Sequence, residues 1–310
     1  MNAIKETGVE TGLKIRKLFV VICAWALGAG LAFSAEDKAT NESHDICFQN
    51  GEACWMNQDH SNSVAWFRKA ILAKPGDALA YALLCRGLFE VGELLPEKAK
   101  KERLALYEEM IRLANEGLRQ NSNSGECYFM RALGVGRRST TKGVLDSLGA
   151  AGPMERDWLK ALDCHIGYTA PNGENALADT YHGLGIYYRL CPDVFLMRWL
   201  FGTMGDLKKA EDFSRKAVAI QGDRIELALE LGVVLVARGL EDKNKTLTEE
   251  GKSWLRKVAE LPVKKKTDEI DQRHARMLLE NPKMCRDYER DGQQERDIKK
   301  AKKDALKKTS

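Results

Sequence analysis

The sequence has few of the residues that carry catalysis or hold metal ions. Five histidines are scattered along the chain, and neither a His-Glu-x-x-His motif nor a Cys-x-x-Cys pair occurs. Cys164 and His165 are adjacent, so on a helix they would point to different faces and could not share one metal ion. A Gly-x-Ser-x-Gly motif is missing, and the paired glycines at 134–136 and 183–185 lie inside helix-like patterns rather than in a phosphate-binding loop. We therefore expect a protein that is not an enzyme and has no metal site and no cofactor.

The sequence also has few strand-like patterns, and its central part has no excess of basic residues. Alternating β-branched runs are rare, while Ala, Leu, Glu, Lys and Arg dominate, which is typical of an all-α fold. The net charge of +4 is concentrated at the two ends: residues 283–310 hold ten Lys/Arg and six Asp/Glu, and residues 1–35 hold four and two. The rest of the chain is slightly acidic, whereas a nucleic-acid-binding domain carries a basic footprint on its folded part. We expect no nucleic-acid partner.

The N-terminus has the pattern of an export signal. Lys14, Arg16 and Lys17 precede the uncharged run 18–35, and small residues stand at 32 and 34. This pattern predicts a secretory signal peptide over residues 1–34, and therefore a periplasmic or otherwise exported protein. The alternative is that residues 18–35 stay uncleaved as a membrane anchor, because the run is just long enough to span a bilayer. Only in that case do we expect contact with a membrane.

The clearest internal pattern lies between Leu177 and Ile220. Two helical segments there place small and large apolar residues three or four apart, at Tyr181, Leu184, Gly185 and Tyr188 and then at Ala210, Ser214 and Ala217. The pattern resembles the tetratricopeptide repeat (TPR), whose signature is Trp-x2-Leu-Gly-x2-Tyr followed by spaced alanines. The resemblance implies an all-α, right-handed TPR-like solenoid.

Looser copies of this pattern run along most of the chain. They predict about five helix pairs within residues 35–282, with a C-terminal capping helix over 268–280 that covers the last apolar face. Pro153 is expected at the first position of the second helix of the third pair. Residues 283–310 are expected to form a charged, partly disordered tail.

Four of the pairs, the second to the fifth, place more residues between their two helices than a standard repeat does. These lengthened turns would lie along one edge of the array, where insertions often mark a binding face. The insert at 192–204 is apolar, with Phe195, Trp199 and Phe201 among its large side chains. Either it packs as additional core, or it walls a pocket to which Trp199 contributes.

The order of residues in this region also resembles exported bacterial TPR proteins, including the periplasmic partners of TRAP-type transporters. The matching residues are Gly185, Tyr188, Leu190, Pro192, Gly205 and Ala217. This resemblance implies a protein or peptide partner, with a transporter or a solute-binding protein as candidates. The alternative function is a periplasmic component that binds a small ligand in a pocket walled by 192–204.

The TPR resemblance also implies a concave groove lined by the first helix of each pair. The positions that match the family's ligand-facing positions carry aromatic residues, arginines and a histidine: Trp55, Arg86, Phe89, Arg137, His182 and Arg189. Arginine offers a planar fork of donors to a carboxylate, so such a groove suits an extended peptide or an acidic group. Each residue could instead be solvated or pair with a local carboxylate such as Glu90 or Asp193.

Seven of the eight cysteines follow the predicted signal segment. Cys47 and Cys54 are seven residues apart on one helix, which puts them about 10 Å apart, beyond the reach of a disulfide. Cys85 falls on a helix-packing position, where cysteine acts as a small apolar residue. We expect mainly buried, reduced thiols.

Overall fold

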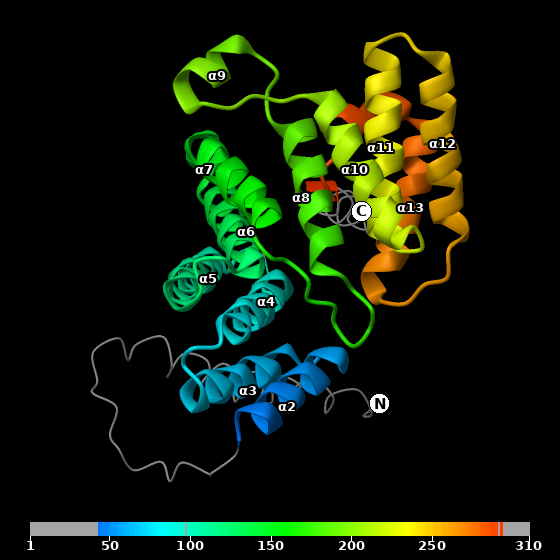
Figure 1. Ribbon diagram of the computed structural model, residues 1–310. Coiled ribbons are helices and arrows are strands. Elements are labelled where there is room, and N and C mark those ends of the chain that lie inside the picture. Colours follow the sequence, from blue (N-terminus) through cyan, green and yellow to red (C-terminus); the bar gives the residue numbers. More distant parts are fainter. Residues whose placement is uncertain (1–42, 97, 291, 294–310) are drawn as a thin grey trace, which may run out of the picture. The chain divides into compact units, whose positions relative to one another are not determined.

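A computed structural model describes residues 43–96, 98–290 and 292–293, which form α-helices and one short 3-10 helix with no strand among them (Figure 1). The predicted signal peptide 1–34, the alternative anchor 18–35 and most of the predicted tail 283–310 lie outside these residues. Within this part of the chain, no helix combines the length and the apolar character that crossing a bilayer requires.

The helices are arranged in consecutive packed pairs, as the sequence predicts. The pairs are α2 (His44–Met56) with α3 (His60–Ala73), α4 (Ala78–Leu94) with α5 (Lys100–Gln120), α6 (Gly125–Lys142) with α7 (Val144–Asp163), α8 (Ala176–Leu190) with α10 (Leu207–Gln221), and α11 (Ile225–Glu241) with α12 (Lys245–Glu260). A further helix, α13 (Lys266–Glu280), packs against α11 and α12. The expected five pairs and terminal helix are therefore confirmed, and the fold is an all-α solenoid.

Local sequence explains where the helices begin. Short polar side chains accept hydrogen bonds from the first free backbone N–H groups at seven helix starts, at Ser43, Asp59, Asp77, Ser124, Asn175, Asp206 and Asn244. Gly185 lets α8 approach α10 closely, because a Cβ at this position would overlap the Ser214 hydroxyl. The small residues of the repeat pattern therefore set the distance between paired helices.

The predicted row of lengthened turns is wrong for three of the four pairs. The extra residues extend the helices instead: only Gly143 separates α6 from α7, and only residues 242–244 separate α11 from α12. Gly143 has φ of 136°, a conformation that glycine adopts without steric cost. Pro153 lies inside α7 rather than at its start, because α7 begins nine residues earlier than predicted. One connection within a pair holds a real insertion, the short helix α9 (Phe195–Phe201) between α8 and α10.

The folded part also continues beyond the predicted boundary at 282. A 3-10 helix, η1 (Pro282–Asp287), contacts α8, α11 and α13, and Cys285 and Tyr288 are buried against them. No apolar period marks this segment in the sequence, because Met284, Cys285 and Tyr288 stand in a mostly charged stretch. Their burial completes the apolar core around α11, α12 and α13.

Candidate functional site

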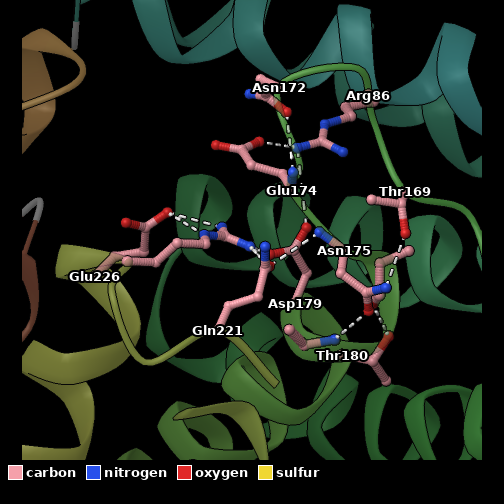
Figure 2. Close-up of polar contacts among 12 residues, drawn as sticks. Arg86, Thr169, Asn172, Glu174, Asn175, Asp179, Thr180, Gln221 and Glu226 are labelled. Carbon is pink, nitrogen blue, oxygen red and sulfur yellow. Dashed lines mark hydrogen bonds and ion pairs between the residues drawn. The ribbon is translucent and has the colours of Figure 1, made fainter. Parts of the chain in front are cut away.

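The connection between α7 and α8, residues 164–175, lies across the first helices of several pairs. The Tyr168 hydroxyl donates to Glu52 of α2 at 2.6 Å, and Glu174 accepts a hydrogen bond from Arg86 of α4. At its end, the Asn175 N–H donates to the Gln221 side chain of α10 at 3.0 Å. Figure 2 shows Glu174 directed at Arg86, with Asn175 between Thr169 and Thr180. We call residues 164–175 the bridging loop, because it ties α2, α4 and α10 together.

Arg86 and Trp55, both predicted site residues, are brought together under the bridging loop. The Arg86 guanidinium lies over the Trp55 ring, 4.3 Å from its centroid, a favourable cation–π arrangement. Together with Tyr168 they line a cavity of about 10 Å³, which is close to the space of a single water molecule. The loop thus fills most of the space above this Arg–Trp pair.

A chain of alternating charges extends from Arg86 towards α11 and α13. Lys265 lies 3.3 Å from Glu174 and 2.8 Å from Glu226, and Arg224 bonds Glu226 and Asp179, each at 2.7 Å. Burial acts to raise the pKa of both Glu174 and Glu226. The charges of Arg86 and Lys265 nevertheless hold the pKa of Glu174 below its usual range. Arg224 and Lys265 do the same for Glu226. Each positive group is therefore neutralised by a carboxylate of the same chain.

Phe89 and Arg137 form a second pair next to this chain of charges. The Arg137 guanidinium carbon lies 5.4 Å from the centre of the Phe89 ring, and Arg137 donates to Glu93 at 2.7 Å. Burial raises the pKa of Glu90, between these two pairs on α4, although Arg86 opposes the shift. The structure thus joins four predicted residues into two Arg–aromatic pairs on α2, α4 and α6.

Arg189 does not face a groove as predicted. Its side chain is 1% exposed, and it donates to both oxygens of Glu230 and, at 2.7 Å, to the carbonyl oxygen of Tyr288. The reason is that the unpredicted segment 282–288 covers this part of α8 and α11. His182 is half-buried on α8, and burial lowers its pKa to about 4, with Glu230 acting in the opposite direction.

Trp199 lies apart from the other predicted residues, on α9. It is 72% exposed, and Phe195 is 77% exposed, whereas the sequence predicts that the apolar insert covers core or a ligand. Only Met197 of this helix is buried, and Phe201 is partly buried against the core. An open hollow of about 520 Å³ between α6 and α7 is lined by other residues, so the insert does not wall it.

Sequence reasoning missed Glu52, Tyr168, Glu174 and Lys265. The Pro171-Asn172-Gly173 turn signal marks the bridging loop, but no local pattern tells how far a loop reaches across other helices. Burial raises the pKa of the Cys54 thiol, next to Trp55 in the chain, and of the Tyr168 hydroxyl, which lowers the share of thiolate and phenolate. Among the residues that the structure describes, no group of three His, Cys, Asp or Glu side chains converges to hold a metal ion.

Comparison with solved structures shows which known helical-repeat fold these helix pairs resemble. TTC0263, a thermophilic TPR protein of Thermus thermophilus, superposes with a TM-score of 0.53 at 14% identity, over 76% of this chain and 100% of that one. The fold is a TPR-like solenoid.

Two further solved structures give lower scores than this TPR-like match. PilF of Pseudomonas aeruginosa has a TM-score of 0.44 at 12% identity, covering 78% of this chain and 86% of that one. MamA has a TM-score of 0.41 at 17% identity, covering 71% and 96%. Neither a protein-family model nor a curated protein matches this sequence.

Proposed function

We propose that this protein is an exported, non-enzymatic scaffold that binds an extended acidic segment of a protein partner at the Trp55–Arg86 pair. The observation that carries the proposal is the bridging loop, a non-helical segment that turns back between Thr169 and Asn175 and whose carboxylate, Glu174, bonds Arg86. The chain's own loop therefore serves as an example of the ligand chemistry that this face accepts. The apolar run 18–35 with its preceding basic residues supports export.

Arg86 and Trp55 supply complementary parts of such a site. The guanidinium presents paired donors to a carboxylate, and the indole ring holds the guanidinium in place from the other side. The Tyr168–Glu52 bond supports a second contact further along, in which Glu52 would accept from an aromatic hydroxyl of the partner segment. Because the loop is tethered in cis, a partner segment has to compete against a high effective concentration of Glu174.

A synthetic peptide with the sequence of residues 165–176 tests this site directly. We expect it to bind the Glu174→Gln variant more tightly than wild type, because this substitution weakens the loop that competes for Arg86. A peptide with glutamine in place of the glutamate should bind less tightly, and Arg86→Ala should abolish binding. Arg112→Ala, a substitution of an exposed α5 arginine, is the matched control. Equal binding of both peptides would contradict the proposal.

The partner itself is sought by crosslinking in cells of the source organism. We propose a transporter component or a solute-binding protein, on the strength of the resemblance of Gly185, Tyr188 and Pro192 to exported TPR proteins. The protein recovered with wild type and with Arg112→Ala should be lost with Arg86→Ala. N-terminal sequencing of the same material tests export, since cleavage after Ser34 would leave Ala35 first.

The second candidate is a carrier of a small ligand. The hollow between α6 and α7 supports it, since about 520 Å³ lies within the usual size of ligand pockets. Arg138 and Asp146 are its charged lining residues. Native mass spectrometry of the purified protein separates the two candidates, because a bound molecule of small mass would favour the carrier.

A further inference from the structure

The short helix α9 carries apolar side chains at six of its seven positions, with Arg198 as the exception, and they lie on its inner and outer faces alike. Met197 and Phe201, one turn apart, face the rest of the protein, and α9 contacts α7. The opposite face presents Phe195, Leu196, Trp199 and Leu200, all more than half exposed, and Val194 before the helix is exposed as well. A helix that is apolar on all sides is normally covered on all sides. The outer face of α9 is therefore an apolar surface on which no described residue of this chain packs.

The size of this surface argues against a second copy of the chain as the cover. A stable protein interface buries about 800 Å² from each partner and involves about 20–30 residues on each side. The outer face of α9 consists of five apolar side chains on a helix of seven residues and its preceding residue. Two such faces placed against each other fall well short of that area.

The length of α9 also argues against insertion into a groove of another protein. Helices recognised in this way present anchors at positions i, i+3 or i+4, and i+7 along one face. A helix of seven residues has no i+7 position, and its exposed residues form the two adjacent pairs 195/199 and 196/200. This arrangement gives a broad apolar tip rather than a narrow ridge.

The chemistry of the tip matches a lipid surface. Trp, Phe and Leu side chains insert at the boundary between headgroups and acyl chains, and a flanking Arg or Lys binds anionic headgroups. Arg198 is exposed at the border of the apolar face, and it is the single charged residue in 194–205. Of the two flanking acidic residues, Asp206 caps α10 by accepting from the N–H groups of Lys208 and Lys209, while Asp193 is exposed.

We propose that the outer face of α9 docks on the surface of a membrane that contains anionic lipid, with Phe195, Trp199 and their neighbours inserted and Arg198 on the headgroups. This contact does not depend on whether residues 18–35 are cleaved, because it is made by the folded array. It is also separate from the Trp55–Arg86 site, which lies on α2 and α4. The scaffold can therefore hold a protein partner beside a lipid surface.

Fluorescence quenching by brominated lipids tests the insertion of Trp199. The full chain is mixed with vesicles of phosphatidylcholine and phosphatidylglycerol, with or without bromine on the acyl chains, for wild type and for Trp199→Phe. We expect wild type to lose a larger share of its emission than Trp199→Phe does. Quenching of Trp25, in the N-terminal run, contributes equally to both proteins. Trp254→Phe, which alters a half-buried residue of α12, should behave as wild type.

Two further measurements decide whether the outer face of α9 binds a lipid surface or a second copy of the chain. Arg198→Gln should lower the affinity for the anionic vesicles about fivefold and leave the affinity for pure phosphatidylcholine unchanged. Equal quenching of wild type and Trp199→Phe would overturn the proposal. In that case, the sedimentation of both proteins is measured without lipid. If wild type dimerises and Phe195→Asp does not, the outer face of α9 binds a second copy of the chain.

Discussion

The guanidinium of Arg189 donates from Nε and Nη2 to the two carboxylate oxygens of Glu230, at 2.7 and 2.9 Å, in a region closed to solvent. The Nη1 group of Arg189 also donates to carbonyl oxygens of the segment after α13, to Tyr288 at 2.7 Å and to Cys285 and Arg286 at 3.4 Å. One buried ion pair thus joins α8, α11 and the C-terminal segment. A residue predicted to bind a foreign peptide binds the backbone of its own chain instead.

Removal of one partner of this pair should be strongly destabilising. Arg189→Ala leaves the Glu230 carboxylate buried and uncompensated, so we expect a loss of about 3–5 kcal/mol in the free energy of unfolding. Urea denaturation measures this loss, with Arg112→Ala on the exposed face of α5 as a control that should change stability by less than about 0.5 kcal/mol. The double variant Arg189→Met/Glu230→Met should be more stable than either single variant. A small loss for Arg189→Ala would mean that Glu230 is hydrated.

Asp271 should make the fold less stable as the pH rises. Its side chain is fully buried on α13, and this burial raises its pKa to about 7, against the opposing effect of Arg290 at 2.9 Å. The unfolded chain has a carboxyl pKa of about 3.9, so between these values the folded state holds a proton that the unfolded state has lost. The contribution of Asp271 to stability therefore falls from about pH 4 to pH 7. Asp271→Asn should remove this slope and be more stable than wild type above pH 7.

His182 should have the opposite effect over almost the same range. Burial lowers its pKa to about 4, while the unfolded value is about 6.5, so the unfolded state binds the extra proton between them. Its contribution to stability is present above pH 6.5 and is lost as the pH falls towards 4. In wild type the two slopes oppose each other. In Asp271→Asn only the effect of His182 remains, so its urea midpoint should fall as the pH is lowered. In His182→Gln only the effect of Asp271 remains, so its urea midpoint should not fall as the pH is lowered.

The cysteines should remain thiols even in an oxidising compartment. No disulfide joins the seven cysteines of the described residues, and Cys85 and Cys127 donate to the carbonyl oxygens of Met110 and Ala78. Burial raises the pKa of Cys127 to about 11, so its reactive thiolate is suppressed. In the native protein we expect Cys54, the least buried of the seven, to be alkylated first. Fewer than three labelled sites in the denatured, unreduced protein would reveal disulfides instead.

Gly185 tests whether the repeat signature acts through helix spacing. Gly185→Ala adds a Cβ that overlaps the Ser214 hydroxyl of α10, so we expect a loss of about 1–3 kcal/mol from overpacking. Adding Ser214→Gly should restore most of the loss, since it empties the space that the new methyl group needs. Gly149→Ala, on α7, is the matched control, because its Cβ would meet no atom. Failure of the double variant to recover would place the cost in the backbone rather than in this contact.

The sequence predicts the helix pairs well because the repeat pattern is local. Gly185, Ala210 and Ala217 each act on a neighbouring helix, and their spacing alone reveals the pairing. The start of α7 is predicted less accurately, because Gly149, Gly152 and Pro153 interrupt the apolar pattern over the first turns of this helix. Pro153 is the clearest case, since proline usually marks a helix start but here lies within α7.

The proposed Trp55–Arg86 site was only partly predictable for a different reason. Trp55, Arg86, Phe89 and Arg137 are correctly placed on the first helices, because the repeat sets which side of a helix they occupy. Glu174, the partner of Arg86, and Lys265, which in turn pairs with Glu174, come from connections far away in the chain, and the cover of Arg189 comes from segment 282–290. Contacts of this kind depend on how separate segments cross in space, which no periodic pattern encodes.

The insert at 192–204 is where the sequence and the structure differ most, and Trp199 provides the test. If Trp199 were buried core, Trp199→Ala would cost about 3–5 kcal/mol of stability. Because the side chain is 72% exposed, we expect a change of less than about 0.5 kcal/mol in the free energy of unfolding. Met197→Ala is the matched variant on the same helix: this side chain is 5% exposed, so its truncation should cost about 2–5 kcal/mol. Urea denaturation of both variants measures the difference. A large loss for Trp199→Ala would mean that α9 turns its outer face inward in solution, and the surface available to a membrane would then not exist.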